Sequence, residues 1–409
     1  MRRFMMTMSF IIIFAAPAYS MTVEEAVRHA LAHHPDLQAL RLEEGSANGR
    51  LAKARLLLNN NPTLGGSISK KDRPEGENGS AYTNYGFKLS QEFEIAGQRG
   101  TRIHMTETEL ARVKAGIKDK ERVLISEVKD SFARVLALKK KNGLAREIVQ
   151  LKEELLGYTR IKFQAGDVSG LDVNLAEVEL SRARRELLLN GREYREALLA
   201  LQGLLGISPD GSFSIQGDLP SDVPALPDRA VLKERARALR PDARAGIFEV
   251  EKARAALKLA EKDVIPNVTL SGFYDRDELR NAVGLEISIP FPLFDRKQAE
   301  KKEAYAKAEG AKIKVDGQKR TIEREVEQAY SDLAAAVEEL TLFKKEIIVK
   351  AAENLNLLNL AFKEGKVGFF EVRLAQKDTI EAQFAYIEAQ TRTQLAVNAI
   401  EKTTGGALK

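Results

Sequence analysis

The sequence predicts a mostly α-helical protein with a small β portion, in which the chain is built from two copies of one unit. Landmarks recur about 200 residues apart, so that Pro35 is answered by Pro241. All 12 prolines lie outside residues 75–208 and 293–409, the two stretches in which helices can run without interruption. Two short segments in which apolar and polar residues alternate indicate strands.

The first twenty residues have the pattern of a secretory signal peptide. Arg2 and Arg3 give a positive start, an apolar run follows, and small residues at Pro17–Ser20 suit cleavage. The apolar run is shorter than the roughly 20 residues of a membrane-spanning helix, which argues against a permanent anchor. We therefore expect four parts, which are a signal peptide (1–20), a first repeat (21–208), a linker (209–228) and a second repeat (229–409).

Composition excludes several classes of protein. The chain has no cysteine and therefore no disulfides or lipoprotein anchor. Its 64 basic and 59 acidic residues are mixed along the whole length, so no basic stripe predicts a nucleic-acid partner. A charged fraction of 30% with only 6% aromatic residues and no tryptophan suits long solvated helices.

No pattern of catalytic residues is present. We find no glycine-rich phosphate loop, no nucleophile elbow and no Cys/His pair, so we predict neither an enzyme nor a cofactor. His29 and His33 stand one helical turn apart, a spacing that permits a weak metal site. Polar surface residues near a helix end explain them more simply, and the sequence predicts no metal site.

The stretch 97–164 is predicted to form one helix about 100 Å long, at about 1.5 Å per residue. Within it an apolar seam recurs at spacings of four and three, as expected for a helix that lies along another helix. Its residues are Leu144, Ile148, Leu151, Leu155 and Tyr158, and the second copy has Ile347, Ala351, Leu355, Leu358 and Phe362. The helices alone would also fit a coiled-coil rod.

Strands distinguish this protein from a rod. Residues 81–93 and 281–291 alternate, with one apolar and one polar face, as in a transmembrane strand between lipid and water. Weaker partner strands are expected at about 62–71 and 267–275. The residues predicted to face lipid are Tyr85, Phe87, Leu89, Val283, Leu285, Ile287 and Ile289.

The alternative to membrane strands is a pair of soluble, half-buried hairpins. Isolated hairpins are only marginally stable and would have nothing to pack on beside such long helices. Four strands are too few to close a barrel, for which about eight are needed. We therefore expect several copies of the chain to share one barrel and to pack their helices into a hollow cylinder.

With this order of elements, the whole mature chain resembles the TolC outer-membrane efflux family. Met21–Ala26 with His34–Leu37 is similar to the family's opening helix. Leu89–Arg99 resembles the strand-to-helix junction of the CzcC branch, which serves heavy-metal pumps of the resistance-nodulation-division class. Phe163–Val173 and Phe362–Val372 resemble the two periplasmic tips of the family.

The resemblance implies a homotrimer in the outer membrane, with a twelve-stranded transmembrane β-barrel, four strands from each chain, and an α-helical barrel in the periplasm. It implies three further partners, namely outer-membrane lipid, an inner-membrane pump and a periplasmic adaptor (membrane fusion protein). The adaptor would dock on the two tips, 166–172 and 365–371. The docking residues are Gly166, Val168, Leu171, Gly365, Val367, Gly368 and Phe369.

In the family, acidic residues just past the second tip help to constrict the closed pore. Glu371 stands where the first such acid is expected, and Asp172 is its equivalent in the first copy. The second acid is missing, because Leu374 takes its place and Arg373 intervenes. A solvated charge at a helix start would equally explain Glu371 and Asp172.

The function that follows is an exit duct of a tripartite efflux system, with heavy-metal cations as the expected cargo. One alternative is a general drug or type I secretion channel, because the pump rather than the duct selects the substrate. A second alternative is a periplasmic adaptor or coiled-coil scaffold, which would also carry a long helical hairpin.

Overall fold

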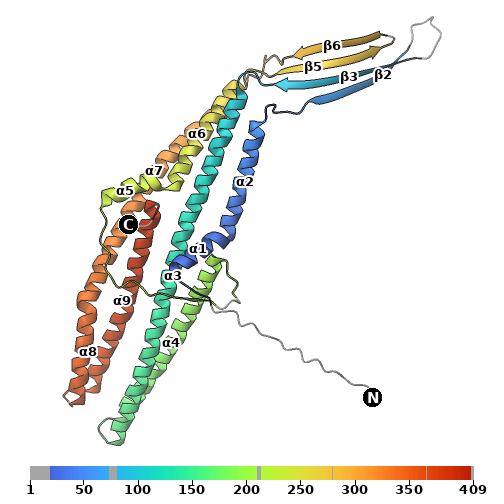
Figure 1. The fold of residues 1–409 in the computed structure, drawn as a ribbon. Coiled ribbons are helices and arrows are strands. Elements are labelled where there is room, and N and C mark those ends of the chain that lie inside the picture. Colours follow the sequence, from blue (N-terminus) through green and yellow to red (C-terminus); the bar gives the residue numbers. More distant parts are fainter. Residues whose placement is uncertain (1–18, 73–80, 210–212, 279, 365, 407–409) are drawn as a thin grey trace, which may run out of the picture. The chain divides into compact units, whose positions relative to one another are not determined.

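The computed structural model describes residues 19–72, 81–209, 213–278, 280–364 and 366–406 (Figure 1). It divides into two compact units that do not follow the sequence repeats. The first unit comprises the chain before Ala39, Glu121–Glu234 and the chain after Arg324, and the second comprises Ala39–Lys120 and Arg235–Arg324. Each unit therefore contains residues from both repeats.

A four-stranded antiparallel sheet belongs to the second unit. Its strands are β2 (Thr63–Lys71), β3 (Tyr82–Phe93), β5 (Val268–Asp277) and β6 (Arg280–Ser288), in the order β2-β3-β5-β6. The helices before the two hairpins are α2 (Pro35–Arg55) and α6 (Pro241–Lys262), and α5 (Arg229–Leu239) precedes α6. One strand prediction was too long at its end. Ile289 lies just beyond β6, because Pro290 has no N–H to continue the ladder.

Two long helical hairpins follow the strand pairs. The first is α3 (Gln98–Gln164) with α4 (Gly170–Leu205), and α3 alone has 67 residues. The second is α7 (Gln298–Leu342), a π-helical turn η1 (Phe343–Ile347) and α8 (Ile348–Lys363), followed by α9 (Phe369–Thr404). Nothing in the sequence pattern predicts the π-helical turn. No helix in the described ranges is long and apolar enough to cross a membrane.

The seam predicted on α3 is displaced by one residue from the line that the chain buries. Ala145, Lys152 and Leu156 are buried, whereas Leu151 and Tyr158 are exposed. The pattern misled because the buried line contains polar side chains and therefore looks less apolar than the face beside it. Leu156 packs against two α4 residues, Ala176 and Leu180.

The first unit also contains a two-stranded parallel sheet of β1 (Tyr19–Met21) and β4 (Phe213–Ile215). Of the predicted signal peptide only Tyr19 and Ser20 are described, and both belong to β1. Helix α1 (Val23–His33) begins with a capping box, in which Thr22 and Glu25 bond each other's backbone. The predicted linker lies against the long helices, because Gln390 of α9 donates a hydrogen bond to the Pro220 carbonyl, 3.3 Å away.

Both repeats start and end their long helices in the same way. The residue before each first helix has a left-handed backbone, with φ of 70° at Gly97 and 59° at Lys297. The glutamine that follows accepts a hydrogen bond from the backbone N–H two residues earlier, in both copies. Gly206 and Gly405 end the two repeats with φ of 70° and 83°.

Candidate functional site: the two-faced sheet and the hairpin tips

One face of the sheet is mainly apolar, although Gln91 and Arg276 also lie on it. The strand register aligns Leu64, Leu89, Gly272 and Leu285 in one row across the four strands. The neighbouring rows place the other predicted lipid-facing residues, Tyr85, Phe87, Val283 and Ile287, on the same face. On the edge strands these side chains are open to the surroundings, with Val283 and Leu285 81% and 80% exposed. An exposed apolar face of this size requires a partner surface.

Aromatic residues mark the two ends of this face. At the end away from the helices, the Tyr85 ring lies 6.3 Å from both Phe87 and Tyr274. The other end of β3 carries Phe93. From Tyr85 to Phe93 the strand advances about 27 Å, or about 21 Å along a membrane normal at a tilt of about 40°. This is close to the roughly 25 Å band of an outer-membrane barrel.

Paired polar groups cover the opposite face. The Lys88 ammonium on β3 reaches across β5 to both carboxylate oxygens of Glu286 on β6, at 2.8 Å each. On the same face, the Ser271 hydroxyl donates a hydrogen bond to the Ser90 hydroxyl at 2.9 Å. Charged and polar groups bonded to each other on the same side of β3, β5 and β6 indicate a face that borders water.

Phe273 is the exception on the polar face, and sequence reasoning missed it. It pairs directly with Gly284 across the β5–β6 ladder. A Cβ at position 284 would come within 2.5 Å of the Phe273 ring, so the ring lies flat over the glycine. Gly284 therefore provides the space in which Phe273 folds down onto the sheet.

Both outer edges of the sheet lack a strand partner within the described part of the chain. β2 pairs only with β3, and β6 pairs only with β5. Their backbone N–H and C=O groups on the outer side need other partners, which lipid does not supply. The sheet is thus incomplete on both sides in a single chain.

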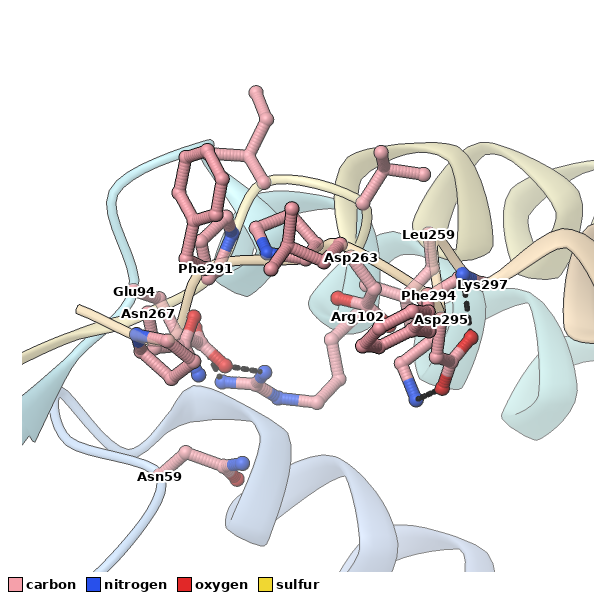
Figure 2. A pocket seen from close by; sticks show the side chains of 16 residues that line it. Asn59, Glu94, Arg102, Leu259, Asp263, Asn267, Phe291, Phe294, Asp295 and Lys297 are labelled. Atoms are coloured by element: carbon pink, nitrogen blue, oxygen red, sulfur yellow. Dashed lines mark hydrogen bonds and ion pairs between the residues drawn. The ribbon is translucent and has the colours of Figure 1, made fainter.

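Where the strands meet the helices, a cavity of about 750 Å³ is lined mainly by apolar side chains, with several charged groups among them (Figure 2). Arg102 of α3 reaches toward Glu94, just past β3, and donates two hydrogen bonds to its carboxylate. Each of these side chains is only 16% exposed. Burial, reinforced by Glu94, raises the pKa of the nearby Asp263 carboxyl. The buried ion pair fixes the end of β3 against the first turns of α3.

The first tip is a tight, capped turn. Gly166 adopts φ of 82°, and the Asp167 N–H donates to the Lys162 carbonyl at 2.9 Å. Ser169 is the N-cap of α4, and Asp172 completes its capping box by accepting hydrogen bonds from the Ser169 N–H and hydroxyl, at 2.9 and 2.7 Å. Val168 is half-buried, whereas Leu171 is 66% exposed. The structure therefore gives Asp172 a capping role beside its predicted place at the pore.

The second tip differs, because Gly368 precedes α9 and provides no side-chain cap. The Glu371 carboxylate folds back toward it, so that a Cβ on Gly368 would lie 2.9 Å from Oε2. Val367 is half-buried, and Phe370 is 63% exposed with the Arg373 guanidinium 5.3 Å from its ring centre. Phe369 begins α9, and Gly365 lies outside the described residues.

A buried polar contact joins the two hairpins, and no pattern in the sequence indicated it. The Lys152 ammonium of α3 donates to Gln376 Oε1 of α9 at 3.2 Å, and Glu179 of α4 lies 4.0 Å away. Lys152 and Gln376 are 6% and 4% exposed. Burial lowers the pKa of Lys152, while Glu179 opposes this effect.

The described ranges contain no group of three or more His, Asp or Glu side chains that is arranged to hold a metal ion. Many acids of the sheet and the helices are instead engaged in ion pairs with neighbouring lysines and arginines, such as Glu177 with Arg160. These features describe a sheet with one apolar and one polar face, and two helical tips.

Comparisons with known proteins agree with this geometry. The sequence matches the family described as "Outer membrane efflux protein" over residues 26–207 and 232–406. The cobalt-zinc-cadmium resistance protein CzcC of Cupriavidus metallidurans is 25% identical over 392 residues, which cover 94% of this chain and 90% of the relative. The pyoverdine export outer membrane protein OpmQ of Pseudomonas aeruginosa is 27% identical over 70% of this chain and 65% of the relative.

Solved structures show the same fold. The outer membrane protein VceC from Vibrio cholerae superposes with a TM-score of 0.78 at 18% sequence identity. The match covers 95% of this chain and 97% of that one.

Proposed function

The chain belongs to the outer membrane efflux protein family, and we propose that it is the exit duct of a tripartite system that expels heavy-metal cations. Its class is an outer-membrane transport channel rather than an enzyme. Membership of this family argues against the alternative of a periplasmic adaptor or scaffold. The substrate, the partners and the oligomer are parts of the proposal.

The sheet carries the proposal. Four strands with one apolar face and two unpaired edges cannot form a closed wall alone. Three copies would supply twelve strands, with each β6 edge pairing with the β2 edge of the next copy. The apolar rows, including Val283, Leu285 and Ile287, would then face lipid, and the Lys88–Glu286 pair would face the water-filled lumen.

An apolar face left open on α3 supports the same assembly. The line through Leu151 and Tyr158 is exposed in the single chain, while the adjacent line through Ala145 and Leu156 is buried. A helix that has two adjacent packing lines suits a closed ring of helices, in which each helix contacts a neighbour on either side. We assign the exposed line to contacts between subunits.

The tips are the surfaces on which we place the periplasmic adaptor, which would link the duct to an inner-membrane pump of the resistance-nodulation-division class. Exposed Leu171 and half-buried Val168 and Val367 offer apolar contacts on tight turns. Gly166 and Gly368 shape those turns, and Phe369 begins the helix after the second, while Gly365, outside the described residues, stays one of the proposed docking positions. Asp172 and Glu371, next to the turns, are the proposed pore-constricting acids.

Heavy-metal cations are the proposed cargo because the relative CzcC is a cobalt-zinc-cadmium resistance protein and spans nearly the whole chain. Export of organic molecules, such as drugs or a secreted polypeptide, is the second candidate. It is favoured by the likeness to OpmQ, a pyoverdine export protein. The fold serves either cargo, since the lumen is a passive path.

A deletion strain tests the cargo. We expect loss of the gene to lower tolerance of cobalt, zinc or cadmium, and the intact gene on a plasmid to restore it. Sensitivity to drugs with unchanged metal tolerance would overturn the metal assignment while leaving the duct in place. Recovery of the protein from the soluble periplasm as a monomer, rather than as heat-sensitive trimers in the outer membrane, would overturn the duct itself.

A further inference from the structure

The polar face of the sheet carries more acid than base, although the whole chain has the opposite balance. The strand register places four carboxylates and three basic groups on this face, namely Glu92, Asp275, Asp277 and Glu286, with Lys71, Lys88 and Arg280. The complete sequence has 64 basic and 59 acidic residues, so the excess of acid on this face does not follow from composition. It is a property of the face that we assign to the lumen.

Most of the acids on this face are engaged locally. Lys88 neutralises Glu286, because both carboxylate oxygens lie 2.8 Å from its ammonium. At the outer end of the strands, the Lys71 ammonium lies 3.7 Å from the carboxylate of Asp277. At the helical end, Glu92 accepts hydrogen bonds from two asparagine amides, at 2.6 and 2.8 Å. At these three positions the negative charge is paired or held by hydrogen bonds.

Asp275 of β5 differs from these acids. It is exposed, and its side chain has neither an ion pair nor a hydrogen bond within the described part of the chain. Its row across the four strands otherwise contains only small residues, which are Ser67, Gly86 and Ala282. The carboxylate lies over the buried Gly86, where a Cβ would overlap Asp275 Oδ1. The glycine therefore provides the space for an unpaired negative charge on this row.

We propose that Asp275 determines the charge selectivity of the barrel lumen, by placing one unpaired carboxylate per subunit at the same height in the pore. The inference rests on the proposed trimeric duct, in which threefold symmetry turns three such carboxylates into a ring. Rings of Asp or Glu side chains select for cations in channels. Such a ring raises the local concentration of cations without holding any of them tightly, as a passive duct for metal ions requires.

The test is the reversal potential of channels that the purified mature protein forms in planar bilayers under a KCl gradient. The salt is kept at or below about 0.1 M, where the screening length is about 10 Å or more. We expect the wild type to prefer potassium to chloride. Asp275→Asn should lower the ratio of the two permeabilities by at least about twofold, because it removes the ring.

Two neighbouring positions on β6 offer a matched pair of rescue variants. Ala282 lies opposite Asp275 on the polar face, whereas Asn281 lies on the other face of the sheet. In the Asp275→Asn background, Ala282→Asp should restore the preference for potassium and Asn281→Asp should not, although both add the same charge. Glu286→Gln should shift selectivity toward chloride, since it leaves the Lys88 ammonium without its partner.

The outcomes separate this inference from the proposed function. An unchanged permeability ratio in Asp275→Asn channels would overturn the role of Asp275 and leave the duct in place. Equal rescue by the two β6 variants would also overturn it, because the charge would then act from either face. Protein that forms no channels in the bilayer would overturn the duct itself, and the inference with it.

Discussion

The Lys152 ammonium on α3 donates a hydrogen bond to the Gln376 side chain on α9, 3.2 Å away, where both residues are almost fully buried. It connects the first helical hairpin to the second. A buried charge that has lost its acceptor costs more than the bond contributes, so this contact makes the pairing of the hairpins depend on one amide.

Replacing the acceptor should therefore loosen the hairpins. We expect Gln376→Leu to lower stability by about 1.5–3 kcal/mol, because the ammonium then keeps only Glu179 at 4.0 Å. Lys152→Met, which removes the charge itself, should cost less. Thermal unfolding and limited proteolysis at the tips measure both effects. Lys350→Ala is the control, since its ion pair with Glu353 is exposed, and equal losses in all three variants would refute the argument.

Substitutions of the two acids near the tips, Glu371 and Asp172, should have different effects. Glu371→Ala should raise single-channel conductance and antibiotic leakage if Glu371 constricts the pore. Asp172→Ala should instead lower stability by about 0.5–1.5 kcal/mol, because it removes the hydrogen bonds that Asp172 accepts from Ser169 in the capping box of α4. Conductance in planar bilayers and thermal unfolding distinguish the two. An unchanged conductance in Glu371→Ala would remove the gate assignment.

Charge on the apolar face should block assembly in the membrane. We expect Leu285→Arg to cost about 2–4 kcal/mol, since its side chain would face hydrocarbon, and to reduce the trimer recovered from outer membranes. Ala282→Arg is the matched control on the polar face, opposite Asp275. Immunoblots of unheated samples give the trimer yield. Equal yields of both variants would show that the two faces do not differ as assigned.

Acid should weaken the helices around Glu109. Its hydrogen bond to Arg112, helped by Lys252, lowers its pKa to about 2. Because the unfolded value is higher, this contribution is complete above about pH 4.5 and is lost as the pH falls toward 2. Glu109→Gln should remove about 1 kcal/mol of pH-dependent stability after solvent screening. Unfolding midpoints measured across this pH range check the prediction, with the exposed Glu303→Gln variant as control. The assignment would be contradicted if the two variants lost the same amount of stability as the pH falls.

Patterns that depend on local chemistry were predictable from the sequence. Alternation identified both faces of β3 and β6, because a strand turns each successive side chain to the opposite side. The turn at the first tip followed from Gly166, which stands just past the helix predicted over 97–164, where a left-handed residue can close the helix. These signals are carried by the residues themselves, so no tertiary information was needed to read them.

Features that depend on tertiary contacts were not predictable from the sequence. The buried line of α3 contains Lys152 and Thr159, so an apolar pattern selected the adjacent face instead. The flat position of Phe273 depends on Gly284 across the ladder, which only the register reveals. The π-helical turn at Phe343–Ile347 likewise has no local signature.

The join between β3 and β5 unites the two repeats, since β2 and β3 come from the first and β5 and β6 from the second. In the proposed trimer, two hairpins from each of three subunits would make six, arranged with pseudo-sixfold symmetry. The β3–β5 pairing inside one chain would then have the same geometry as the pairing between β6 of one subunit and β2 of the next. A half-length ancestor could have built the same wall as a hexamer. Duplication and fusion would have halved the number of separate pieces that must meet.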